Sequence, residues 1–516
     1  MSRKIQLTLL IDQDVEEMIR KEVPEMVDYR VLSQSLDARG AQRGATPKWH
    51  YTVEVIKAGE RFTKFEQTFP KLKPFKQKPI IIGMGPAGLF AALRFSEYGI
   101  PTVLIERGDR ANQRMKHIAR FWRYGEFDSE NNVCYGEGGA GLFSDGKLIT
   151  RIKSPHVDYV MQRFVDFGAP PETAYISNPH LGSNKIRGLI TGMTEHLQAH
   201  GCEIKTNTRV DKILFEKNKA VGVELSNGDK VFSDHVILAT GHSAKEMYHH
   251  LKTEKVQMKA KDFAIGVRIE HPRRLIDRLQ HGEWCSHPTL GAARYRLSYE
   301  NPKSKKGTYS FCMCPGGYVL SSGTDADGLV VNGMSNYARN SPWSNAALVV
   351  AVKAGLDFKT DDVLNGLNFQ TSIEQLAYNK SKEHATGREI PAQTLFDFID
   401  NKKSKTLPKT SCPSGIFSNP MTEILPKFVT EHLQMALTEF DRMIKGFVSR
   451  EALLLAPETR TSAPVTIERD RETLESLSHR GLYPCGEGAG YAGGITSAAV
   501  DGVKVAESIL KFVQME

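Results

Sequence analysis

The segment that most constrains the fold is Pro79–Gly88, in which three isoleucines lead directly into a glycine-rich turn. A continuous apolar run such as Ile80–Ile82 is typical of a parallel strand that is buried on both faces. The glycines that follow have the spacing G-x-G-x-x-G, which allows a tight turn, close approach of the backbone to a pyrophosphate, and close packing of the next helix. The pattern therefore predicts a dinucleotide-binding βαβ unit.

The residues after this turn fit the same unit. Pro86 suits the first turn of a helix, whose free N–H groups attract a diphosphate. A second apolar run, Thr102–Ile105, ends in Glu106, where an acidic side chain accepts hydrogen bonds from a ribose and disfavours a 2′-phosphate. The basic segment that follows contributes at its start to binding of the adenosine diphosphate. The expected dinucleotide ligands here are Gly83, Gly85, Pro86, Ala87, Gly88, Glu106, Arg107 and Arg114.

Three later segments favour FAD over NAD. The strand before Gly241 ends in Ala-Thr-Gly, which resembles the point where flavoproteins with two dinucleotides leave their FAD domain. A glycine-rich loop at 135–148 supplies backbone donors for a flavin and its pyrophosphate. In the C-terminal block, Glu487 stands where flavoproteins commonly carry Asp, and a helix begins near Ile495 whose N-terminus stabilises a reduced flavin. These segments add Gly139, Ala140, Gly141, Ser144, Lys147, Leu148, Val210, Gly241, Gly486, Glu487, Gly494 and Ile495 to the expected FAD ligands.

Lys147 has two interpretations. It lies near the flavin N5 or a phosphate, or it is an ordinary surface lysine, and the sequence favours neither.

Changes in pattern along the chain divide it into five segments. Residues 1–70 predict a small α/β unit, with strands at 4–10, 29–35 and 49–56 and a helix at 14–22. A further strand is expected at 203–215. The predicted domains are 1–70, a linker at 71–78, a first FAD-binding part at 79–250, a substrate or cap domain at 251–464, and a second FAD-binding part at 465–516.

Composition narrows the class of protein. Apolar stretches such as Ala346–Val352 fall far short of the roughly 20 residues of a membrane-spanning helix. The short run Leu7–Ile11 is followed at once by acidic residues, which argues against a signal peptide. The 7 cysteines are an odd number spread over the chain, as in a reducing compartment, so a cytoplasmic protein without a membrane partner is expected. The net charge of +8 suits an anionic cofactor and is only weak evidence for nucleic acid, a partner that we do not expect and that the sequence does not exclude.

The sequence offers few candidates for redox-active, metal-binding, catalytic or substrate-binding residues. No C-x-x-C or C-x₄-C pair follows the first helix, which argues against a dithiol–flavin relay. Cys312 and Cys314 are two residues apart and too few for a metal site; they are read as core, with redox or metal use as the alternative. We expect no metal and cannot assign a catalytic residue. Arginines that are candidates for holding an anionic or carbonyl substrate are Arg268, Arg294, Arg296 and Arg460, with Arg268 and Arg460 preferred; an ordinary salt bridge is the alternative for each.

Several of these motifs resemble one bacterial family. They are the loop Gly136–Lys147, the segments Gly266–Pro272, Phe311–Gly317, Asn332–Ser335 and Glu458–Pro464, and the block Gly486–Gly502. The sequence is similar over nearly its whole length to the uncharacterised FAD-dependent dehydrogenases, described as NAD(FAD)-utilising, within the glutathione-reductase-type flavoproteins. The resemblance implies FAD binding and an α/β fold: a discontinuous glutathione-reductase-type FAD/NAD(P)-binding Rossmann-like domain, an inserted mixed-sheet cap and a small N-terminal α/β domain.

The expected function is an FAD-dependent oxidoreductase that passes hydride through flavin N5 to or from a small organic substrate. A second G-x-G-x-x-G is absent, so NAD(P)H, if it is the electron donor, binds transiently or in the cap. Two alternatives stay open: a flavin-dependent RNA-modifying enzyme that uses the basic N-terminal part, and a non-catalytic flavin-binding redox sensor. The sequence sets neither the substrate nor the oligomeric state.

Overall fold

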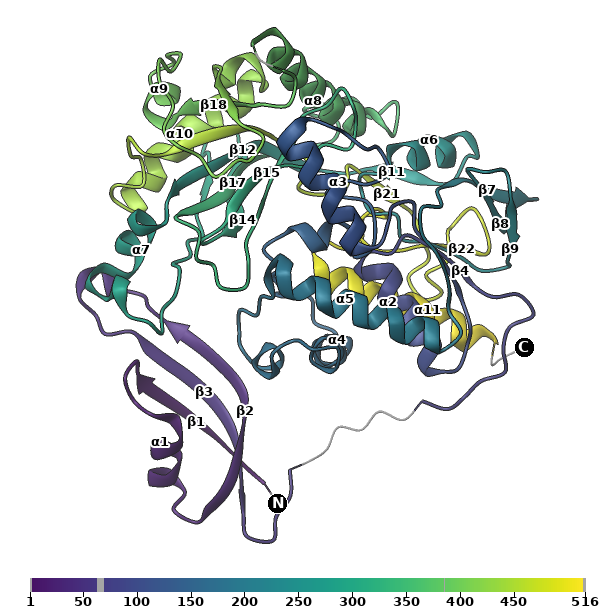
Figure 1. Cartoon of the computed structure of the whole chain (residues 1–516), viewed down its shortest axis with the longest axis horizontal. Coiled ribbons are helices and arrows are strands. Elements are labelled where there is room, and N and C mark those ends of the chain that lie inside the picture. Colours follow the sequence, from purple (N-terminus) through teal and green to yellow (C-terminus); the bar gives the residue numbers. More distant parts are fainter. Residues whose placement is uncertain (1, 63–68, 385, 514–516) are drawn as a thin grey trace.

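The apolar run at 80–82 forms the centre of a five-stranded parallel sheet in the computed structural model, which describes residues 2–62, 69–384 and 386–513 (Figure 1). The strand order is β22-β10-β4-β5-β6, so a strand from the C-terminal segment lies beside one from the middle of the chain. The strands are β4 (Ile80–Ile82), β5 (Val103–Ile105), β6 (Glu203–Lys205), β10 (Val236–Leu238) and β22 (Leu482–Pro484).

The two faces of this sheet are covered differently, because successive side chains of a strand point to opposite faces. Ile81 packs in a core with α2 (Pro86–Glu97) and α11 (Ile495–Val513). Ile80 and Ile82 pack in a second core with a small antiparallel sheet and α6. The remaining elements around the parallel sheet are α3 (Ala111–Tyr124), α4 (His156–Asp166), α5 (Gly182–Ala199), β7 (Val210–Glu216), β8 (Lys219–Leu225), β9 (Lys230–Phe232) and α6 (Lys245–Thr253).

The single strand expected at 203–215 is wrong. The segment divides into β6, which joins the parallel sheet, and β7, which joins the antiparallel sheet with β8 and β9. Asn207 between them has a left-handed backbone, with a φ of 51°. Uniform β propensity along the segment does not reveal that the chain turns from one sheet into another there.

A seven-stranded mixed sheet lies at the centre of the segment between β10 and β22. Its order is β13-β14-β17-β12-β20-β18-β19, and the long strands β12 and β17 are almost wholly buried. Helices pack on this sheet around a third apolar core. The elements are β12 (Phe263–Pro272), α7 (Arg273–His281), β13 (Ser298–Glu300), β14 (Gly307–Cys314), β17 (Trp343–Val352), α8 (Asn365–His384), β18 (Ile390–Thr394), α9 (Leu395–Ile399), β19 (Ile416–Ser418), α10 (Lys427–Met443) and β20 (Leu453–Glu458).

Two short antiparallel pairs complete the sheets. The first joins β15 (Tyr318–Ser321) to β16 (Val331–Met334). The second joins β11 (Met258–Ala260) to β21 (Val465–Ile467), where the chain leaves and re-enters the part that carries the parallel sheet.

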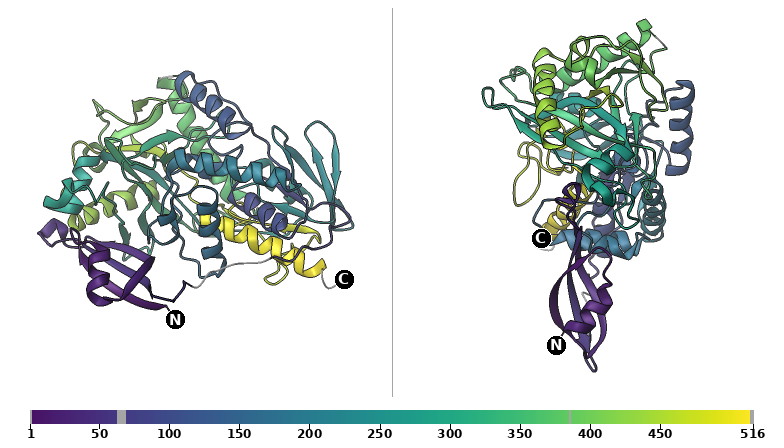
Figure 2. Two further views of the ribbon diagram at one scale, coloured as in Figure 1. Left: turned by 60° about the horizontal axis from the view of Figure 1, so that its bottom comes forward. Right: turned by 90° about the vertical axis from the view of Figure 1, so that its left-hand side faces the viewer.

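The N-terminal unit projects from the rest of the molecule (Figure 2). It contains β1 (Arg3–Leu10), α1 (Val15–Glu22), β2 (Met26–Asp37) and β3 (Lys48–Lys57) in the sheet order β1-β3-β2, and these bounds confirm the helix and strands that the sequence predicts. It touches the body where Gln34 donates its backbone N–H to the Tyr175 carbonyl oxygen at 3.0 Å, and where His287 lies 2.9 Å from Asp12.

The expected linker contains no helix or strand, and Leu72 and Phe75 pack against the core of the parallel sheet. Residues 1, 63–68, 385 and 514–516 of the predicted domains lie outside the described residues. Within the described ranges, no helix combines the length and apolar character that crossing a membrane requires.

Candidate active site

A cavity of about 1100 Å³ extends from the turn after β4 to the cap strand β14. Its lining includes most of the residues that the sequence predicts as ligands. These are Gly83, Gly85, Pro86, Ala87, Glu106, Arg107, Gly139, Ala140, Gly141, Ser144, Lys147, Val210, Gly241, Arg460, Glu487, Gly494 and Ile495. The carboxyl ends of parallel strands are the usual ligand site of such sheets, and the cavity lies there.

The three motif glycines have different structural environments. A Cβ atom on Gly83, whose φ is 102°, would stand 2.4 Å from the Ala239 carbonyl oxygen. A Cβ on Gly88 would stand 1.9 Å from the Gly83 carbonyl oxygen, so this glycine is needed for packing and does not line the cavity. At Gly85 the nearest atom to a Cβ would be 3.9 Å away, and this backbone faces the cavity. The turn fits a dinucleotide because it presents bare backbone at the start of α2.

Glu106 has a larger role in the protein than the sequence indicates. Its carboxylate accepts backbone N–H groups from Met84 at 2.9 Å, Gly108 at 3.0 Å and Gly136 at 2.8 Å. The side chain thereby ties the phosphate turn to the glycine-rich loop. Each carboxylate oxygen has two lone pairs, so Oε2, which accepts one of these hydrogen bonds, can still accept a ribose hydroxyl.

Arg114 lies beneath the glycine-rich loop and outside the cavity lining. Its buried guanidinium donates to the carbonyl oxygens of Asn132 at 2.9 Å, Val133 at 2.8 Å and Glu137 at 2.9 Å. Arg114 therefore fixes the shape of the loop. Arg107 lines the cavity, and its Nε lies 2.6 Å from Glu130.

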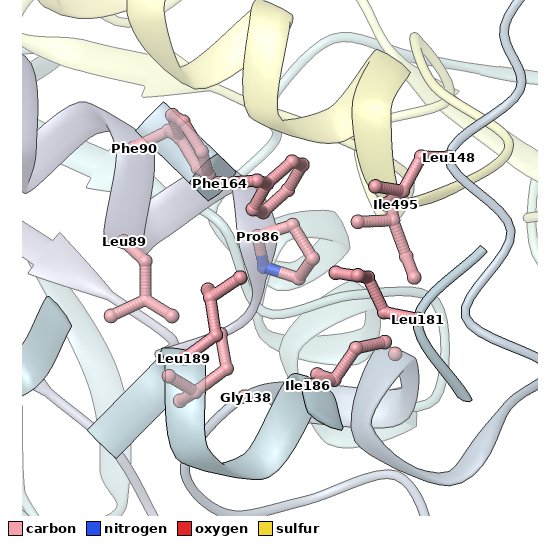
Figure 3. A pocket seen from close by; sticks show the side chains of 12 residues that line it. Pro86, Leu89, Phe90, Gly138, Leu148, Phe164, Leu181, Ile186, Leu189 and Ile495 are labelled. Carbon is pink, nitrogen blue, oxygen red and sulfur yellow. The ribbon is translucent and has the colours of Figure 1, made fainter. Parts of the chain in front are cut away.

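Leu148 and Gly486 also lie outside the lining of the large cavity. Leu148 points into a separate apolar space of about 10 Å³ beside Pro86, Ile186 and Ile495 (Figure 3). This space is too small for any part of a flavin, and its wall of carbon atoms supports the α2 turn from behind.

The start of α11 forms another wall of the cavity. Gly486 donates its N–H to Asp501 at 2.8 Å, and Asp501 also pairs with Arg469 at 2.6 Å. The next residue, Glu487, points into the cavity, and burial raises the pKa of its carboxyl to about 7.

Lys147 is not a free surface lysine, because it lines the cavity and its ammonium is held from two sides. It lies 3.3 Å from Asp145 and donates to the backbone carbonyl of Met313 in the cap. Asp145 is buried and also pairs with Arg339. This cluster links the glycine-rich loop to the cap beside the cavity.

The arginines proposed for substrate differ in their surroundings. Arg268 is fully buried outside the cavity lining, where it pairs with Glu458 at 2.8 Å and donates to Asn345. Arg460 lines the cavity, but its guanidinium pairs with buried Glu374 at 2.7 Å. The third, Arg294, lines the cavity and forms no hydrogen bond or ion pair with any residue in the described ranges.

Two cysteines belong to the lining of the cavity. Cys134 is one of them and is partly exposed. Cys312, expected in the core, also lines it, because β14 bulges between Phe311 and Cys314. The C-x-C spacing before a Pro-Gly-Gly turn is the sequence signal that marks this position.

Comparison with family models shows two adjacent matches. Residues 128–262 match the model "Flavin containing amine oxidoreductase", and residues 262–461 match "FAD-dependent protein, C-terminal domain-like". The second match spans most of the cap. Both models describe flavin-dependent proteins, so the cofactor is FAD and the chain is an FAD-dependent oxidoreductase.

Three similar proteins differ greatly in how much they share with this chain. Protein FixC of Escherichia coli K12 is 29% identical over 213 residues, which are 39% of this chain and 45% of FixC. A solved oxidoreductase from Methanosarcina mazei is 12% identical and covers 84% of this chain and 100% of its own; its TM-score of 0.34 is too low to support an argument. An uncharacterised protein of Clostridium beijerinckii is 42% identical over 454 residues, or 88% of this chain and 84% of the clostridial one. The chain therefore belongs to the family of this clostridial protein, a family of FAD-dependent proteins.

Proposed function

We propose that this protein passes hydride between FAD and a small organic anion that binds at the cap end of the cavity. The observation that carries the proposal is Arg294, a guanidinium without a hydrogen-bond or ion-pair partner among the described residues, in the same cavity as the dinucleotide turn. FAD supplies a ring that accepts or releases hydride at N5. The protein supplies orientation, charge and exclusion of water.

The proposed FAD-binding unit is discontinuous and of glutathione-reductase type, formed by 79–250 and 465–516 with 251–464 as the cap. The parallel sheet supports this division, because β22 from the last segment pairs with β10 from the first. In this arrangement Glu106, Val210 and Gly241 would hold the adenosine. The backbone at Gly85 and the start of α2 would hold the pyrophosphate, and the glycine-rich loop and the start of α11 would hold the flavin.

The cap end of the cavity is rich in positive charge. Lys147, Arg151, Arg294 and Arg296 all line it. Asp145 pairs with Lys147 and with Arg339. Among the described residues, Arg151, Arg294 and Arg296 form no ion pair, so a carboxylate or phosphate bound there would meet three arginines without a counter-ion.

Arg294 is the strongest of these anchors. Burial, and then the nearby charge of Arg339, lowers the pKa of its guanidinium to about 10. The arginine is thus still charged at neutral pH, although its surroundings disfavour the charge. An anion that accepts its hydrogen bonds would relieve this cost, and a planar guanidinium binds a carboxylate with two parallel hydrogen bonds.

The proposal is tested by screening the FAD-loaded protein without oxygen against matched anionic and neutral compounds. The panel contains hydroxy acids, amines, amino acids, their uncharged amides and alcohols, and NADH and NADPH. Amines are included because of the amine oxidoreductase match. Binding is read from perturbation of the flavin absorbance, and reaction from its bleaching.

We expect the compounds that bleach the flavin to be anions, and Arg294→Gln to weaken their binding roughly 10–100-fold, since a charge-assisted hydrogen bond contributes about 1.5–3 kcal/mol. The FAD content of this variant should be unchanged. Arg278→Gln, an exposed arginine of the same domain outside the cavity lining, is the control. Equal bleaching by neutral compounds, or unaltered binding in Arg294→Gln, would rule out the proposal.

A further inference from the structure

The end of β14 brings two cysteines into an irregular arrangement beside the cavity. Cys312 lines the cavity, and Cys314 is fully buried behind it. Cys312 has a φ of 43°, in the left-handed region that residues other than glycine rarely adopt. Such strain persists only where surrounding contacts enforce it, and it is frequent at functional sites.

The bulge determines how near the two sulfurs lie. In a regular strand, residues two apart point to the same face about 6.6 Å from each other, too far for a disulfide, which needs Cβ atoms about 3.5–4.5 Å apart. Here the pairing with β17 is interrupted between Phe311 and Cys314. The thiol of Cys314 donates a hydrogen bond to the carbonyl oxygen of Cys312, with Sγ 3.4 Å from that oxygen, so the Cys314 sulfur lies directly beside the strained Cys312 residue.

The charges around the pair favour a thiolate on the cavity side. The neighbouring Cys314 thiol, and then the cations of Lys147 and Arg268, lower the pKa of Cys312 against the opposing effect of burial. The neighbouring Cys312, together with burial, raises the pKa of Cys314 well above its usual value. Asp145 and Glu458 face this region as well, but each is paired with a cation of its own.

A metal site does not explain these cysteines. Two thiol ligands are too few for a structural metal, and the part of the chain that is described has no group of three or more His, Cys, Asp and Glu side chains placed to bind one. A purely structural role does not explain them either, because it requires neither the strained backbone nor a sulfur that faces the cofactor cavity.

We propose that Cys312 and Cys314 form a redox-active dithiol that exchanges an electron pair with FAD bound in the cavity. In the oxidising direction the Cys312 thiolate and the Cys314 thiol form one S–S bond. The electron pair and the Cys314 proton pass to FAD, which becomes the reduced anion. The reverse step restores both thiols, so the protein stores a second electron pair beside its flavin.

The first test counts thiols under denaturing conditions after the FAD-loaded protein has been fully oxidised, and again after anaerobic reduction. Of the 7 cysteines, all should be free after reduction and two should be lost after oxidation. Mass spectrometry should place the lost thiols at Cys312 and Cys314. Cys312→Ser and Cys314→Ser should each show no loss, whereas Cys134→Ser and Cys285→Ser should lose two as the unaltered protein does.

The second test titrates the oxidised protein with dithionite under nitrogen while the flavin absorbance is followed. The unaltered protein should take up about four electrons per FAD, and Cys312→Ser about two. Cys312→Ala provides a second variant at this position, and retained FAD shows that each variant has folded.

Free thiols at both positions after oxidation, together with uptake of only two electrons, would overturn the proposal. So would a loss of thiols that persists in both cysteine variants. Neither result would contradict the proposed hydride transfer to an organic anion, because that proposal is tested separately with Arg294→Gln.

Discussion

Arg460 and Glu374 form a buried ion pair that joins the end of β20 to α8. Arg460 Nη2 lies 2.7 Å from Glu374 Oε2, and Arg460 Nε lies 3.0 Å from Glu374 Oε1. Lys245 and Asp325 complete the cluster, 2.6 Å apart. The arginine that the sequence offers as a substrate anchor thus already has a carboxylate within the protein.

Replacing Arg460 with Met should destabilise the protein severely. The change leaves Glu374 buried with one fewer counter-ion, and breaking a buried pair costs about 3–5 kcal/mol. Urea unfolding at neutral pH measures this. In the double variant Arg460→Met/Glu374→Leu, Lys245 and Asp325 remain paired, so much of the loss should be recovered. A double variant as unstable as the single one would contradict the pairing.

The same pair predicts how stability changes in acid. Arg460 and then Lys245 lower the pKa of Glu374 to about 2, against the opposing effect of burial. A carboxyl whose pKa is lower in the folded protein than in the unfolded chain stabilises the folded protein. This contribution is complete above the pKa of the unfolded chain, about 4.5, and is lost as the pH falls towards 2. The stability difference between the unaltered protein and Glu374→Gln should therefore shrink between pH 4.5 and pH 2. A constant difference over that range would show that the carboxylate is not the stabilising form.

Substitutions at two glycines of the turn should distinguish a role in cofactor binding from a role in packing. Gly85→Ala places a Cβ no closer than 3.9 Å to any other atom, an ordinary contact, so the FAD-free protein should keep its melting temperature and bind FAD more weakly. Gly88→Ala places a Cβ 1.9 Å from the Gly83 carbonyl oxygen, so the FAD-free protein itself should be destabilised by several degrees. Calorimetry of the FAD-free proteins and fluorescence titration with FAD distinguish the two. Equal melting temperatures for both variants would contradict the packing role of Gly88.

Glu487 should make stability depend on pH near neutrality. Because burial raises the pKa of its carboxyl to about 7, the folded protein holds this proton more tightly than the unfolded chain does. The cost of ionising it therefore grows as the pH rises from about 4.5 to about 7. The side chain is 30% exposed, so solvent reduces the effect, and Glu487→Gln should stabilise the FAD-free protein by on the order of 1–3 kcal/mol above pH 7 and little at pH 4.5.

The control for this prediction is Glu431→Gln on the exposed face of α10. Its effect should be small and independent of pH. A gain in Glu487→Gln that is the same at pH 4.5 and pH 8 would indicate better packing and not the loss of a buried charge.

The sequence predicts the elements that local patterns determine. The turn between β4 and α2, the strand that ends at Glu106 and the small N-terminal unit all follow from apolar runs, glycines and alternation within a few residues. Binding of FAD follows from the same local motifs and is shown by the family models.

The features of the fold and of the site that the sequence does not predict depend on contacts between residues that are distant along the chain. Whether Arg268, Arg294 or Arg460 is available to a ligand depends on Glu458 and Glu374, which the fold brings near two of them and not the third. The exposure of Cys312 depends on a bulge against β17, and the division of 203–215 depends on two different partner strands. No pattern within these segments specifies those partners.

The order of strands in the parallel sheet has a consequence for how the protein is made. β4 is synthesised early, whereas its near neighbour β22 and the helix α11, whose Gly502 packs against Ala87 of α2, follow the entire cap. The whole cap is therefore synthesised before the last wall of the cofactor cavity exists. A cavity with all its walls can form only once α11 has been made, which places capture of the flavin at the end of synthesis or after it.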